Sequence, residues 1–82
     1  MSSDELREKM HSLDATLRVG KNGIESVAEE LETQLDDRRF VKVKFHRASR
    51  AGTDTEELAQ KLADRVGASG IETRGHTAVI AR

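Results

Sequence analysis

The chain has 82 residues, a formal net charge of −1 and no cysteine. A chain of this length folds as one domain with a modest core, so a large internal cofactor pocket is not expected. The absence of cysteine excludes a disulfide scaffold and every thiolate metal site, and is compatible with a reducing compartment. The start MSSDELREK is too charged for a signal peptide, and no stretch approaches the roughly 20 apolar residues of a membrane span. We therefore expect a soluble cytoplasmic protein.

The first predicted elements are a short helix and a strand. Ser2 and Glu5 have the spacing of a capping box, and we place the helix at about residues 3–12. The apolar residues on its inward face are Leu6, Met10 and Leu13. Apolar and polar residues then alternate over residues 15–19, which predicts a half-buried strand that stops at Gly20.

A second helix and a second strand follow. From residue 24 the apolar residues have spacings of three and four, which predicts an amphipathic helix that ends at Arg38 and Arg39. Its inward face comprises Ile24, Val27, Ala28, Leu31 and Leu35. The next segment, FVKVKFHR, alternates as a strand. We expect its apolar face to pack and its other face, with Lys42, Lys44 and His46, to be exposed to solvent.

The last third of the chain predicts a helix and a hairpin. We expect Thr53 to be the N-cap of this helix, with Glu56 three residues later, and Gly67 to end it. The inward face comprises Leu58, Ala59, Leu62, Ala63 and Val66. Two strand-like runs, IETR and TAVIAR, flank Gly75 and His76, and a two-residue loop with glycine first is typical of a type II′ turn.

These elements predict a single α/β (α+β) domain of order α-β-α-β-α-β-β with a four-stranded mixed sheet. The strand-helix-strand connection implies that the first two strands pair in parallel, whereas the last two form an antiparallel hairpin. The run TAVIA is apolar on both faces apart from its first residue. We therefore expect the N-terminal helix to cover the second face of this strand.

The charges are sorted along the chain. Residues 24–37 contain six acids and no base, whereas residues 38–50 contain six bases and no acid. A charge run is usually a solvated face. A basic block within an otherwise acidic small domain, however, concentrates positive potential and favours an anionic partner.

The loop GKNG, residues 20–23, joins the first strand to the second helix. The first N–H groups of a helix lack intrahelical partners, and glycines let backbone N–H groups approach a phosphate. Lys21 would add charge, and Asn22 would cap the helix with Glu25 in the box position. An ordinary strand-to-helix turn has the same composition, so the loop alone is a weak signal. It matches neither a nucleotide P-loop nor a dinucleotide fingerprint.

The second strand strengthens this interpretation. A parallel neighbour runs in the same direction, so Lys42, Lys44, His46 and then Arg47 and Arg50 lead toward the edge of the sheet that holds GKNG. Loop and strand can then share one ligand, and that ligand would be a polyanion with several phosphates.

The segments LRVGKNGI, VKVKF and GHTAVIAR together resemble the CRM domain (chloroplast RNA splicing and ribosome maturation), in particular its free-standing YhbY-like form. This resemblance covers nearly the whole chain. It implies a fold similar to the C-terminal domain of a translation initiation factor, RNA binding through the GxxG loop, and association with large-subunit ribosomal RNA or its precursor. The family often has an aromatic residue near the end of the last strand and a basic tail, whereas this chain has Ala81 and ends at Arg82.

The partner that we expect is therefore structured RNA, with ribosomal proteins as further partners, no membrane, no cofactor and no metal, and we expect a monomer. The candidate RNA-binding residues are Arg18, Gly20, Lys21, Asn22, Gly23, Lys42, Lys44, Arg47, Arg50, Arg74 and His76.

Three alternatives compete with this interpretation. An enzyme is not indicated, because His11, His46 and His76 are dispersed and no serine lies in a nucleophile motif. Binding by base stacking is not indicated either, because the chain has only two aromatic residues. A module that docks a basic protein through its acidic second helix stays open as the alternative.

Overall fold

The structure is a computed structural model that describes residues 3–47 and 52–82. Its elements follow the predicted order. They are α1 (Ser3–Ser12), β1 (Leu17–Val19), α2 (Glu25–Asp37), β2 (Phe40–Phe45), α3 (Thr55–Val66), β3 (Gly70–Arg74) and β4 (Thr77–Ala81). The predicted α+β class is therefore confirmed.

The four described strands form one mixed sheet of order β1-β2-β4-β3. β1 pairs with β2 in parallel, with Val19 opposite Phe45. β4 lies between β2 and β3 and is antiparallel to both. Gly75 has a φ of 59°, whereas no described non-glycine residue, and therefore not His76, has a positive φ. A type II′ turn between β3 and β4 requires a positive φ at its first central residue only. Both predicted pairings are confirmed.

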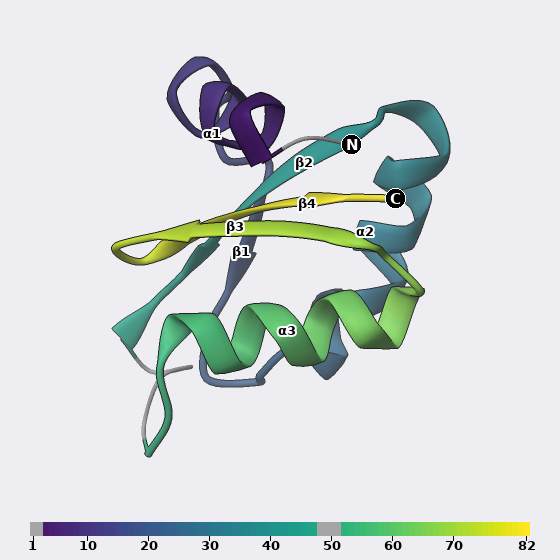
Figure 1. The fold of residues 1–82 in the computed structure, drawn as a ribbon. Coiled ribbons are helices and arrows are strands. Elements are labelled where there is room, and N and C mark those ends of the chain that lie inside the picture. Colours follow the sequence, from purple (N-terminus) through teal and green to yellow (C-terminus); the bar gives the residue numbers. More distant parts are fainter. Residues whose placement is uncertain (1–2, 48–51) are drawn as a thin grey trace.

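The sheet separates two helical layers (Figure 1), with α2 and α3 packed on one face and α1 on the other. The larger core lies between the sheet and the α2–α3 layer. Its fully buried side chains include Val19, Leu31, Val41, Val43, Phe45, Leu62 and Ile80. Burial of each of these side chains stabilises the fold by about 1.5–3 kcal/mol. The inward-facing positions of β1, β2 and β4 are accordingly all apolar, whereas Thr73 on the edge strand β3 is polar and half-buried.

A second, smaller apolar cluster lies under α1. It consists of Leu6, Met10, Phe40, Val79 and Ala81. β4 is thus buried on both faces, and the predicted cover by the N-terminal helix is confirmed. Arg39, the residue before β2, contacts this helix from the surface, because its guanidinium lies 3.6 Å from Glu5 and 5.4 Å from the centre of the Phe40 ring.

Two predicted helix caps were wrong. α3 is capped by Asp54 instead of Thr53, and an Asp54 carboxylate oxygen accepts the Glu57 N–H at 2.8 Å. α2 begins after Ile24 without any side-chain cap, so Asn22 does not have the predicted role. The predicted αL stop is confirmed at Gly67, with a φ of 70°. Ser2, assigned to a capping box, lies outside the described residues.

Candidate functional site

Three segments meet at the carboxyl ends of β1 and β2. The N–H of His46 donates to the carbonyl of Val19 at 2.9 Å, which ties the exit of β2 to the residue before the GKNG loop. The N–H of Phe45 donates to the carbonyl of His76 at 2.7 Å, which brings in the β3–β4 turn. The predicted shared edge of loop and second strand is therefore confirmed, and the hairpin turn is a third component.

The GKNG loop is a tight turn that presents its two central side chains to solvent. The N–H of Gly23 donates to the carbonyl of Gly20 at 3.0 Å, and Gly23 has a φ of 77°, which glycine adopts without strain. Lys21 and Asn22 are exposed. The space where a Cβ of Gly20 would lie is open. The backbone at the start of α2 is thus accessible, while the hydroxyl of Ser26 donates to the carbonyl of Gly23 at 2.8 Å.

One line of side chains crosses all four strands beside this loop. Lys44 on β2 lies opposite Arg18 on β1 and opposite Thr77 on β4. Thr77 in turn lies opposite Arg74 on β3. We call Arg18, Lys44, Thr77 and Arg74 the cross-strand row. Side chains alternate along strands, and the residues that flank this row, such as Val43 and Ala78, belong to the core under α2 and α3. The row therefore lies on the other face of the sheet, next to the carboxyl end of α1, which contacts Thr77 and Arg74.

Most cations elsewhere on the described chain have a carboxylate partner. The ion pairs are Arg7–Asp4, Arg39–Glu5, Lys61–Glu57, Arg65–Glu25 and Arg82–Asp36. None of the site cations forms an ion pair with a described residue. These cations, which we call the basic edge, are Arg18, Lys21, Lys44, Arg47 and Arg74, and all are exposed. Their charge is therefore available to an external anion.

Arg74 is oriented by the end of α1. Its guanidinium nitrogen Nη1 lies 3.1 Å from Nε2 of His11. His11 is not among the site residues predicted from the sequence, because its contact with Arg74 joins residues 63 positions apart. The hairpin register that places Arg74 opposite Thr77 was, by contrast, implicit in the two-residue turn.

Lys42 departs from its predicted exposure. This side chain is half-buried, and its ammonium donates to the carbonyl of Met10 at 2.7 Å and to that of Leu13 at 3.3 Å. The last carbonyls of a helix lack intrahelical donors, and Lys42 supplies one to the end of α1. The strand alternation had assigned Lys42 to the correct face, but α1 covers that part of it.

The other predicted residues are distributed around the same edge. Arg47 follows the exit of β2, and His76 lies in the exposed β3–β4 turn. Arg50 lies outside the described residues. The predicted site residues that the structure describes therefore lie together at one edge, with Lys42 set back beneath α1.

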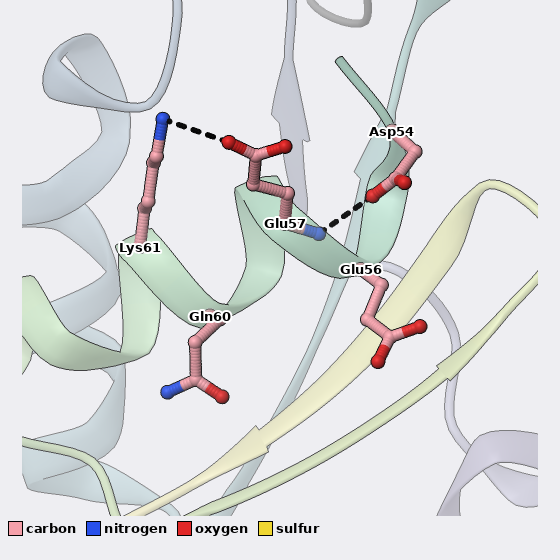
Figure 2. A pocket seen from close by; sticks show the side chains of 5 residues that line it. All are labelled: Asp54, Glu56, Glu57, Gln60 and Lys61. Carbon is pink, nitrogen blue, oxygen red and sulfur yellow. Dashed lines mark hydrogen bonds and ion pairs between the residues drawn. The ribbon is translucent and has the colours of Figure 1, made fainter.

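The α2–α3 layer carries the opposite charge. A shallow hollow on α3 (Figure 2) is lined by Asp54, Glu56, Glu57, Gln60 and Lys61. Lys61 lies 3.3 Å from a Glu57 carboxylate oxygen, so much of the polar lining is satisfied internally. Residues 3–47 and 52–82 contain no group of three His, Cys, Asp or Glu residues suited to a metal ion. None of their helices has the length and hydropathy needed to span a membrane.

Comparison with known proteins places the chain in a family. The model of the CRS1/YhbY (CRM) domain matches residues 2–82. The chain belongs to the CRM family. This CRM domain is 38% identical over 77 residues to a protein of Methanocaldococcus jannaschii named probable RNA-binding protein MJ0652. The match covers 94% of this chain but only 58% of that relative.

A solved structure agrees with the fold. The solution structure of SAV1595 from Staphylococcus aureus, a hypothetical protein suggested to bind RNA, superimposes with a TM-score of 0.78 at 28% identity. The match covers 96% of this CRM domain and 81% of that chain. The arrangement of three helices and a four-stranded sheet is therefore shared with that protein.

Proposed function

We propose that this CRM domain binds RNA through its basic edge and its GKNG loop. The observation that carries the proposal is that five exposed cations gather at the edge where the loop, β2 and the hairpin turn meet, and that none of them has a carboxylate partner within residues 3–47 and 52–82. Clustered unpaired cations attract phosphates and release bound counterions. Family membership and the name of the archaeal relative support RNA as the polyanion.

Structured RNA is the proposed class of ligand. Phe40 and Phe45 are buried and the chain has no Tyr or Trp, so no benzene or indole ring is available for stacking of unpaired bases. Recognition then depends on phosphates, 2′-hydroxyls and helix shape. On the family resemblance we extend the proposal to large-subunit ribosomal RNA or its precursor, bound in the cytoplasm by a monomer without catalysis.

Binding of the purified domain to structured ribosomal RNA fragments, matched single strands and duplex DNA over a salt series tests this function. We expect a preference for structured RNA, with log K falling linearly against log salt by roughly 0.7–0.9 per phosphate neutralised. Lys21→Glu should abolish binding while the domain stays folded, and Arg38→Glu is the control at an exposed, unpaired arginine outside the basic edge. Absence of RNA binding at low salt would overturn the proposal.

Docking of a basic protein, such as a ribosomal protein, through α2 is the second candidate. Glu29 and Glu32 are exposed on α2 and form no ion pair within the described chain. Reversal of these two charges would weaken protein docking, whereas RNA binding through the basic edge would be unchanged.

A further inference from the structure

We infer that the cross-strand row is a track for the backbone of one RNA strand, which crosses the sheet at right angles to the β-strands. This inference rests on the proposed function and adds a direction and a length to it. The track begins at Arg18, beside the GKNG loop, passes Lys44 and ends at Arg74.

The spacing of the sheet sets the length of the track. The row occupies neighbouring positions on four strands in the order β1-β2-β4-β3. Adjacent strands lie about 4.8 Å apart, so the backbone positions of Arg18 and Arg74 are separated by about 14 Å. The row carries three cations over this length, so the track matches about three consecutive phosphates, one for each cation.

Helix α1 forms one side of this track. The next position toward the amino end of β2 on the same face is Lys42, which α1 covers and which donates to the carbonyls of Met10 and Leu13. The carboxyl end of a helix carries partial negative charge that would repel a phosphate. Lys42 offsets this charge, so we assign it a positioning role instead of a direct contact. His11, from the same helix end, orients Arg74.

The track has few groups that read bases. The hydroxyl of Thr77 donates to the carbonyl of Arg74 at 2.9 Å, and it also lies 3.3 Å from the sulfur of Met10. The remaining members of the row are two arginines and a lysine, and both phenylalanines are buried. Contacts to phosphates position a nucleic acid without reading its sequence. The track therefore depends on the shape of the RNA backbone, and the loop or junction of a structured RNA fixes the one register in which that shape occurs.

The track can be tested by neutralising short blocks of RNA phosphates, one position after another along each strand. Hairpin RNAs are made in which a block of three consecutive phosphates is replaced by methylphosphonates, and the block is moved along each strand in turn. The wild-type domain is compared with the triple variant Arg18→Gln, Lys44→Gln, Arg74→Gln, with Arg38→Gln as the matched control. Circular dichroism and urea unfolding confirm that each variant is folded.

We expect one block position, on one strand only, to weaken wild-type binding at least about tenfold, and we expect the same block to have little effect on the triple variant. Arg38→Gln should behave as wild type. The track would be overturned, with RNA binding itself intact, if every block position lowered the affinity equally. It would also be overturned if the triple variant showed the same dependence of affinity on block position as the wild type. Failure of the wild-type domain to bind the unmodified hairpin would overturn the proposed function and the track together.

Discussion

The ammonium group of Lys42 lies 2.7 Å from the carbonyl oxygen of Met10 and so joins strand β2 to the last turn of α1. A lysine next to the basic edge thereby contributes to the stability of the fold. Its neighbour on the same strand face, Lys44, is exposed and has no carboxylate partner among the described residues. Two lysines two residues apart thus have different roles.

Lys42→Met is expected to lower the free energy of unfolding by about 1–2 kcal/mol, because two buried carbonyls lose a charged donor. Lys44→Met removes the same charge at an exposed position and should change stability by less than about 0.5 kcal/mol. Urea unfolding of the two variants makes the comparison. Equal stability of both would show that the contact with α1 contributes nothing.

The two glycines of the GKNG loop allow backbone strain to be tested separately from the access of RNA phosphates to the backbone. Gly23→Ala places a side chain at a φ of 77° and should cost about 1–2 kcal/mol of stability. Gly20 does not have a positive φ, and a Cβ there meets no atom within 4 Å, so Gly20→Ala should leave stability nearly unchanged. If RNA phosphates approach this backbone, Gly20→Ala still weakens RNA binding.

Gly67→Ala is the control for this pair. Gly67 has a φ of 70° at the end of α3 and is as strained by substitution as Gly23, but it lies outside the loop. We expect similar destabilisation with RNA affinity unchanged. A loss of affinity in Gly67→Ala equal to that in Gly23→Ala would show that stability alone controls binding.

The core residues could be predicted from the sequence, whereas the cross-strand row could not. Apolar spacing assigned Leu31, Leu62 and the alternating residues of β2 correctly, because a helix stripe or strand alternation is a local pattern. The cross-strand row depends on β4 lying between β2 and β3, an order that no local pattern contains. Only when β4 is inserted does Thr77 connect Lys44 to Arg74.

The caps show a second limit. Thr53 and Asp54 are both common capping residues, and only the backbone decides which one meets the N–H groups of α3. In the fold Asp54 is extended and accepts from Glu57, while the hydroxyl of Thr53 donates to the Glu57 carboxylate at 3.0 Å. Alternation along β2 similarly assigned Lys42 to a face without showing that α1 lies over it.

The salt dependence of RNA affinity should give the number of phosphate contacts that the basic edge makes. Each of Lys21→Gln, Arg18→Gln and Arg47→Gln removes one unpaired cation, and each should reduce the slope of log K against log salt by roughly 0.7–0.9. Arg65→Gln removes a cation that already pairs with Glu25, on the opposite layer, and should leave the slope unchanged. Fluorescence anisotropy with one labelled RNA hairpin at several salt concentrations gives these slopes.

Asp54→Ala tests the corrected cap. Loss of the Asp54 carboxylate leaves the Glu57 N–H without its acceptor and should lower the free energy of unfolding by about 1 kcal/mol. Thr53→Ala, next to it, should cost less, because its hydroxyl does not serve the backbone of α3. Both residues line a hollow with Gly75 and His76 of the β3–β4 turn, so thermal unfolding without RNA is the measurement that distinguishes the two variants. A larger loss in Thr53→Ala would restore the cap predicted from the sequence.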